Sequence, residues 1–284
     1  MVVRRLVPGE LGPTGGPAFT DVLGVCTSWG DGVCVVQPSA GPPVSIPLDL
    51  IVSGKPVPPR PSTRLRVSAR EAESHAAPIW PGVERVPLGE WELRSDPRPL
   101  GRLVKRANSC LAMGSAAAPF EAAVETVRDF YVSRERPVMV QVEADSSIEE
   151  AFREAGWTTL ERGEASFRLV STARLNRGLS ASPDDAESPR LDVNGQTATA
   201  ALPHAHGRAT LDGDWLGLHD LHVDPAHRRQ GLARRVVAEL AAWGAEQGAR
   251  TTWLHVETDN APALALYDSL GFLTHHTCRY LTPP

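Results

Sequence analysis

Basic and small residues gather in one short segment of the chain, at positions 228 to 234. The segment reads Arg228-Arg229-Gln230-Gly231-Leu232-Ala233-Arg234 and follows the strand-like run 215–223 and an Asp-Pro pair. A helix-like run, 232–247, begins inside it, with apolar residues at spacings of four, four and three that form one face. A strand, a tight basic turn and a helix start together are typical of an anion-binding site.

The residue types in this turn suit a phosphate group. Gly231 has no side chain and lets the backbone approach the ligand closely. The free N–H groups of a first helical turn point at the ligand, and the helix dipole favours negative charge there. The small side chain of Ala233 leaves room for a pyrophosphate, and the arginines add positive charge. Taken alone, the same residues also fit a solvent-exposed, arginine-rich helix start.

A second block downstream decides between these interpretations. It consists of Thr258-Asp259-Asn260-Ala261-Pro262, then Leu266-Tyr267, then Leu270-Gly271-Phe272. Together with Arg-x-x-Gly-x-Ala after Val-Asp-Pro, this block resembles the acyl-CoA signature of the GNAT acetyltransferase superfamily. The resemblance covers residues 216–272 and therefore says little about the acyl acceptor.

The resemblance implies acetyl-CoA as co-substrate and gives roles to individual residues. Backbone groups of Leu221, His222 and Val223 would bind the pantetheine arm as a strand binds a sheet edge. Amides from Arg229 through Gln230, Gly231, Leu232 and Ala233 to Arg234 would hold the pyrophosphate, with Arg228 adding charge. Asn260 would hydrogen-bond the cofactor, and Tyr267 would lie near the thioester sulfur.

The implied reaction moves acetyl from acetyl-CoA to a primary amine by direct attack; an acceptor hydroxyl stays open. An alkyl ammonium with a pKa near ~10 must first lose a proton to a base. The N–H of Val223 is a candidate to polarise the thioester carbonyl. Tyr267 is the candidate proton donor for the thiolate, whose acid has a pKa of about 8.5, so that its help is modest.

Three side chains are candidates for the base. His219 is favoured because histidine titrates near neutral pH, although it could also simply fill the strand surface. Asp220 would point to the opposite face of a regular strand, but a β-bulge could reverse that. Glu257, just after the next strand, is the third.

The order of elements around the motif occurs twice in the chain. Helix 120–133, strand 138–142 and helix 148–155 end in Gly156-Trp157, and 232–247, 251–256 and 262–270 end in Gly271-Phe272. From the valine that ends the strand to the glycine there are 14 residues in the first copy and 15 in the second, which favours duplication over chance. The first copy lacks the arginine-rich turn and has Phe152 where the second has Tyr267, so we expect the second to be the active one.

The first sixty residues read as short β-rich runs separated by Gly and Pro, which fits a small closed barrel of the SH3 type. These runs are 2–7, 21–26, 33–36, 44–46 and 50–52, and the Pro-rich and polar connectors are 56–61 and 179–189. The predicted fold class is α/β (α+β): tandem GNAT-like units, with a mixed central sheet flanked by helices, behind an SH3-like barrel. The predicted boundaries are 1–58 for the barrel, 59–78 for a linker, 79–174 for the degenerate unit and 175–284 for the acyl-CoA unit.

Composition narrows the remaining classes. A net charge of −5 argues against a nucleic-acid binder, and no apolar run reaches the ~20 residues of a membrane helix. The four cysteines show no CxxC pair or zinc spacing, so a reduced cytoplasmic protein without metal is expected, and a homodimer stays open. Two rival functions remain: an acyl-CoA sensor without turnover, and an adaptor that acts through the barrel.

Overall fold

The computed structural model of the chain describes residues 1–12, 15–38, 41–55, 63–99, 104–179 and 188–284. The Pro-rich connector predicted at 56–61 and most of the polar connector predicted at 179–189 lie outside these residues. The chain forms two compact units, residues 1–61 and 62–284. Among the described helices, none has the length and apolar character needed to cross a membrane.

The first unit is all-β, as predicted. Its described strands are β1 (Val2–Leu11), β2 (Pro17–Leu23), β3 (Val25–Gly30), β4 (Val33–Gln37), β5 (Val44–Pro47) and β6 (Ile51–Lys55). They form two three-stranded antiparallel sheets, in the orders β2-β1-β6 and β3-β4-β5. Val3, Cys34, Val36 and Ile46 are fully buried and form the core of this unit. Closure into an SH3-like barrel stays a prediction.

The second unit is built on one large mixed sheet, as the predicted fold class requires. Twelve strands of the described residues belong to it, with the order β13-β14-β15-β16-β17-β12-β18-β10-β9-β8-β7 and β11 beside β18. Their bounds are β7 (Glu84–Leu88), β8 (Trp91–Ser95), β9 (Cys110–Leu111), β10 (Val140–Glu143), β11 (Thr158–Thr159), β12 (Ala165–Ser171), β13 (Arg190–Asn194), β14 (Thr197–Leu202), β15 (Ala205–Asp212), β16 (Trp215–Val223), β17 (Thr251–Glu257) and β18 (Leu273–Thr282).

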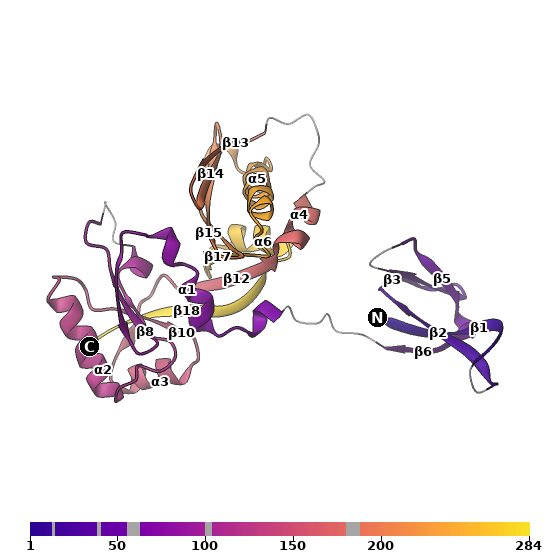
Figure 1. Cartoon of the computed structure of the whole chain (residues 1–284), viewed down its shortest axis with the longest axis horizontal. Coiled ribbons are helices and arrows are strands. Elements are labelled where there is room, and N and C mark those ends of the chain that lie inside the picture. The colour runs from indigo at the N-terminus through magenta and orange to yellow at the C-terminus, as the bar shows by residue number, and fades with distance from the viewer. Residues whose placement is uncertain (13–14, 39–40, 56–62, 100–103, 180–187) are drawn as a thin grey trace. The chain divides into compact units, whose positions relative to one another are not determined.

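Helices cover the sheet in two groups (Figure 1). Their bounds are α1 (Ala69–Ser74), α2 (Phe120–Val132), α3 (Ser147–Glu154), α4 (Thr172–Leu179), α5 (Leu232–Glu246) and α6 (Ala261–Ser269). Helices α4, α5 and α6 lie beside strands β13 to β17, and α2 and α3 lie at the other end beside β8 and β10. Each group has its own apolar core, so the second unit consists of two halves on one sheet.

The two halves repeat one order of elements. The first contains α2, β10 and α3, the second contains α5, β17 and α6, and the predicted ranges agree with the observed bounds to within about three residues at each end. Each half also contains a parallel strand pair, β9 with β10 and β16 with β17.

The halves exchange their last strands. Strand β12 ends the first half in sequence but pairs with β17 of the second half from Ala165↔Glu257 to Ser171↔Thr251. Strand β18 ends the second half but pairs with β10 of the first, and it also pairs with β12. Each half therefore obtains a strand of its sheet from the other half.

The segment 63–79, most of it within the predicted linker, contains a helix and core residues. Helix α1 starts at a capping motif in which the side chain of Ser68 accepts a hydrogen bond from the Glu71 amide at 3.1 Å. Ala72 and Ala76 are buried with Phe167 and Trp253. This segment therefore belongs to the second unit, because its short apolar side chains complete a core on the face of the sheet opposite α5.

Candidate active site

Strands β16 and β17 separate partway along their length. Their parallel pairing runs from Trp215↔Thr251 to Leu218↔Leu254 and goes no further in the described residues. Strand β16 continues to Val223 paired only with β15, while β17 continues to Glu257 paired with β12. The edge of β16 that faces β17 is therefore open from His219 to Val223, which includes the residues predicted to bind the pantetheine arm.

A β-bulge at Asp220 changes which side chains face α5. The pairing of β15 with β16 shifts register between His206↔His222 and Arg208↔His219, and Asp220 has a φ of 54°. Leu218 packs in the core beneath α5 before the bulge, whereas Leu221 and Val223 pack against that core after it. The β-bulge that the sequence analysis names as an alternative to a regular strand is therefore present. The side chain of Asp220 is exposed.

Helix α5 begins at the open end of β16. Gly231 is its N-cap residue, with a φ of 78° and no side chain capping the first turn. This left-handed conformation favours glycine, although a Cβ at this position would meet no atom within 4 Å. Arg228, Arg229 and Gln230 are exposed before it, and Leu232 and Ala233 begin the helix. Uncapped first-turn amides beside exposed arginines form a site suited to an anion.

The arginines of this turn differ in their contacts. Arg228 Nε lies 3.4 Å from the carbonyl oxygen of Val223, at the end of β16. Arg234 is directed elsewhere: its guanidinium donates to Ser269 Oγ at 3.1 Å and to the Gly178 carbonyl at 3.2 Å. The side chain of Arg234 therefore connects α5 to α6 and α4, which leaves only its backbone amide in the first turn of α5.

Helix α6 brings Asn260 and Tyr267 to the same part of the second half. Asn260 Oδ1 caps the helix by accepting from the Ala263 amide at 3.2 Å. Tyr267 is buried in the core beneath α5 and contacts Phe272 edge to face. Burial raises the pKa of Tyr267 to about 12, so its hydroxyl keeps its proton at neutral pH.

His219 lies on the opposite face of the sheet from Tyr267. Its Nε2 lies 3.0 Å from Thr210 Oγ1, on the neighbouring strand β15. Burial, together with the positive charge of Arg208, lowers the pKa of His219 to about 4. The imidazole is therefore neutral at pH 7 but a weaker base than an ordinary histidine, so the reason for favouring it, titration near neutral pH, is wrong in this environment. Glu257, the third candidate, is exposed at the end of β17.

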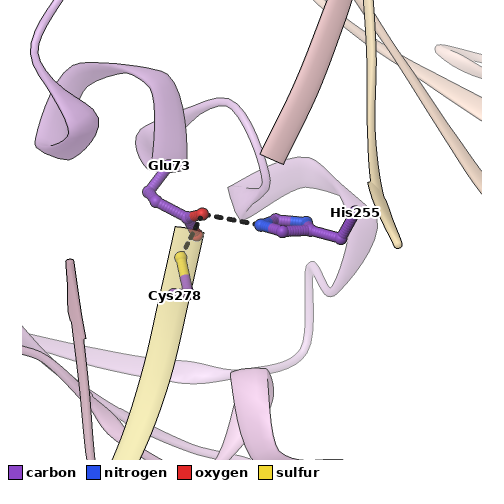
Figure 2. A group of neighbouring side chains, drawn as sticks. All are labelled: Glu73, His255 and Cys278. Carbon is purple, nitrogen blue, oxygen red and sulfur yellow. Dashed lines mark hydrogen bonds and ion pairs between the residues drawn. The ribbon is translucent and has the colours of Figure 1, made fainter. Parts of the chain in front are cut away.

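A buried polar cluster on the His219 face of the sheet was not predicted from the sequence. Figure 2 shows three of its residues, Glu73, His255 and Cys278. Glu73 of α1 contacts His255 of β17 and Cys278 of β18, which lie 182 and 205 residues away in sequence. Burial acts to raise the pKa of Glu73, but His255 and His276 outweigh it and hold this pKa well below its usual value. Only the His-x-Cys alternation of His276 and Cys278, on one face of a strand, could have indicated part of the cluster.

A group of exposed and half-exposed histidines lies next to the basic turn. His204 Nδ1 is 3.1 Å from Asp224 Oδ2, and the rings of His204 and His227 stack with centroids 3.5 Å apart. Asp224 and His227 belong to the connection between β16 and α5. Ligand atoms of these three residues lie within 4.8 Å of one another.

The opened strand pair, the bulged strand and the uncapped helix start together define a site for an acyl-CoA-dependent acyltransferase. Known proteins agree with this class. Residues 181–281 match a family profile described as "Probable histone acetyltransferase Rv0428c C-terminal". The chain is 31% identical over 238 residues to the probable histone acetyltransferase Rv0428c of Mycobacterium tuberculosis, across 76% of this chain and 75% of that protein.

Two further matches concern sequence and fold. The ribosomal protein bS18-alanine N-acetyltransferase of Escherichia coli is 46% identical over 83 residues, which are 29% of this chain and about half (52%) of that enzyme. A GCN5-related N-acetyltransferase from Kribbella flavida has the same fold, with a TM-score of 0.55 and 17% identity over 77% of this chain and 96% of its own. The chain belongs to the GNAT family of acetyltransferases and is an acetyl-CoA-dependent acyltransferase.

Proposed function

We propose that the protein transfers an acetyl group from acetyl-CoA to a primary amine by direct attack. The separation of β16 from β17 after the Leu218↔Leu254 pair is the observation that carries this proposal. Among the described residues it leaves Leu221, His222 and Val223 without a strand partner on the β17 side, where Arg228 Nε contacts the Val223 carbonyl, and this edge leads directly to the uncapped first turn of α5. A pantetheine arm on the edge and a pyrophosphate on the turn would fit this arrangement.

The cofactor contacts proposed from the sequence agree with this placement. Amides from Arg229 to Arg234 would hold the pyrophosphate, and Arg228 would contribute charge from its exposed side chain. Asn260 uses its carbonyl oxygen to cap α6, so its amide nitrogen is the group left to donate to the cofactor.

In the proposed reaction the amine nitrogen attacks the thioester carbonyl carbon and the carbon–sulfur bond then breaks. His219, neutral at pH 7, takes the proton that the amine loses. Tyr267 gives its hydroxyl proton to the departing thiolate. The two residues would reach the separated strands from opposite faces of the sheet, so the acceptor would approach from the face that carries His219.

An amine acceptor is supported by the chemistry that the relatives' names describe. One acts on the nitrogen of an alanine of ribosomal protein bS18, and its 83-residue match has the highest identity of the two sequence relatives above. The other is named as a probable histone acetyltransferase. We extend this acceptor class, a primary amine, to the present chain.

The domain boundaries complete the proposal. Residues 79–174 would form the degenerate unit and 175–284 the acyl-CoA unit, apart from the exchanged strands β12 and β18. The strands of residues 1–58 would close into an SH3-like barrel around Val3 and Ile46.

Calorimetry with acetyl-CoA, followed by an amine screen that monitors free thiol, tests the proposal. Micromolar binding and thiol release that depends on an amine, with an N-acetylated product by mass spectrometry, would support it. An O-acetylated product would overturn the acceptor class alone. A folded protein that binds no acetyl-CoA would overturn the cofactor site as well.

A further inference from the structure

We propose that Glu73, His255, His276 and Cys278 form a buried structural site for a zinc-class transition-metal ion. All three partners converge on one oxygen, Glu73 Oε1: His255 Nε2 at 2.6 Å, His276 Nε2 at 3.2 Å and Cys278 Sγ at 3.3 Å. The ligand atoms of Glu73, His255 and Cys278 all lie within 4.8 Å of one another. His276 Nε2 lies outside this group and would have to move closer to its members to become the fourth ligand. The side chains of Glu73, His255 and His276 are at most 4% exposed.

The three distances from Glu73 Oε1 can be compared with those of a tetrahedral site. Zinc bonds of about 2.0–2.3 Å to nitrogen, oxygen and sulfur place neighbouring ligand atoms about 3.3–3.6 Å apart. The distances from Glu73 Oε1 to His276 Nε2 and to Cys278 Sγ, 3.2 and 3.3 Å, are already near this range. The contact with His255, at 2.6 Å, would have to open by about 0.7 Å to reach it.

Hydrogen-bond donors and acceptors show why a cation fits between these atoms. His275 Nε2 lies 3.0 Å from the Val67 carbonyl oxygen, which can only accept, so this nitrogen donates. A neutral His275 then accepts at Nδ1 from His276 Nδ1, 2.7 Å away. His276 faces the carboxylate of Glu73 with Nε2, the atom through which it lowers the pKa of Glu73 and through which it could bind a cation instead.

A bound metal ion would take the place of the proton between His276 Nε2 and Glu73 Oε1, and both atoms would become its ligands. The His276–His275–Val67 chain is then the outer support that metal-bound histidines usually have, with the other ring N–H fixed by an acceptor. The ring of Phe167 stacks on His276 and contacts His255 edge to face, which gives the site an apolar wall.

Charge and ligand type select the ion. One carboxylate and one thiolate together balance the charge of a divalent cation. Thiolate and imidazole ligands favour zinc or cobalt over magnesium or calcium. With His276 moved in as the fourth ligand, the coordination sphere would be closed, which is the arrangement of a structural site. The ion would join α1, β17 and β18, whose contributions lie up to 205 residues apart in sequence.

Metal analysis of the full chain, expressed without a polyhistidine tag in zinc-supplemented medium and washed with chelator, tests this proposal. We expect about one equivalent of zinc per chain in the wild type and less than about a tenth in Cys278→Ser. Chains grown with cobalt should show a thiolate-to-cobalt charge-transfer band in the near ultraviolet, which Cys278→Ser loses. Cys26→Ser, which changes a thiol of the first unit, is the matched control and should retain both signals.

The surface histidine group provides the second control. The double variant His204→Ala, His227→Ala removes two of its three ligands and should leave the zinc content unchanged. Zinc lost from this variant, or retained in Cys278→Ser, would overturn the buried site. So would a folded wild-type chain that holds less than about a tenth of an equivalent and shows no cobalt band. The cluster would then be a hydrogen-bonded network in which a doubly protonated His276 pairs with Glu73. The wild-type cobalt spectrum decides the question even if Cys278→Ser does not fold.

Discussion

Replacing Gly231 with glutamate tests the anion site most directly. Gly231 has a φ of 78° and open space around its Cβ position, so a longer side chain would extend into solvent without displacing neighbours. The substitution then has two effects: strain of the left-handed backbone, and a negative charge beside the turn that would hold the pyrophosphate. Gly231→Gln has nearly the same shape and strain but no charge, so the difference between the two variants isolates the electrostatic effect.

The electrostatic effect can be estimated from Coulomb's law. A carboxylate about 6 Å from two phosphate charges is repelled by about 1.4 kcal/mol at the dielectric constant of water and by about 5.5 kcal/mol at an effective value of 20. The turn is exposed, which favours the lower part of this range. We therefore expect about 2 kcal/mol, or roughly a 30-fold weaker affinity for acetyl-CoA in Gly231→Glu than in Gly231→Gln. Backbone strain, roughly 1–2 kcal/mol, is common to both variants.

Calorimetric titration with acetyl-CoA at low and high salt measures this difference. The gap between the two variants should narrow as salt rises, because salt screens exposed charges. Gly248→Ala is the control for strain: it has a φ of 89° at the other end of α5, also with open space at Cβ, and should lose stability without losing affinity. Equal affinities of Gly231→Glu and Gly231→Gln at low salt would refute the placement of the pyrophosphate at this helix start.

Further expectations concern catalysis, pH dependence and packing. Tyr267→Phe should lower kcat by roughly 10-fold and leave acetyl-CoA binding within about twofold, because the ring stays and only the proton donor is lost; unchanged kcat would exclude the proton-donor role. The free energy of unfolding should fall by up to about 3 kcal/mol from pH 6.5 to 4, because His219 takes up a proton in the unfolded chain in this interval while its folded pKa is about 4. Denaturant titrations of the His219→Gln variant over the same interval should lack this part of the pH dependence. Arg234→Ala should lower the free energy of unfolding by about 1–2 kcal/mol, because its hydrogen bonds to α4 and α6 are lost, yet weaken acetyl-CoA binding far less than Gly231→Glu does. A larger loss of affinity would show that the Arg234 guanidinium contacts the cofactor. Residues 62–284 should unfold cooperatively on heating, as followed by circular dichroism, whereas residues 175–284, which lack β12, should not. Cooperative unfolding of the shorter fragment would show that β12 is dispensable.

Much of the second half was predictable because its signals are local. The helix start at Gly231 follows from a basic turn placed between a strand and an apolar helical face, and the structure has that helix at Leu232–Glu246. The alignment of two chain segments around Gly156 and Gly271 likewise predicted two halves with the same elements. Such patterns depend only on neighbours in sequence, so a single sequence is enough to read them.

Other features depend on contacts that no local pattern records. Glu73 lies on a six-residue helix inside a predicted linker, and its partners lie 182 to 205 residues away, so the buried cluster emerges only in three dimensions. The orientation of Arg234 toward Gly178 and Ser269 depends in the same way on how α4 and α6 pack. The Asp220 bulge was foreseen only as an alternative, because a regular strand fits the same residues.

The strand exchange makes the second half depend on the first. Strand β12 pairs with β17 over seven residues, on the side of β17 that faces away from the open edge of β16. Without this strand, β17 would have no partner on that side of the sheet. Nothing would then hold β17 in place where β16 separates from it, at His219. The first half has Phe152 where the second has Tyr267, and its last strand supports β17 where β16 separates from it. The second half therefore depends on the fold of the first, whatever chemistry the first half carries.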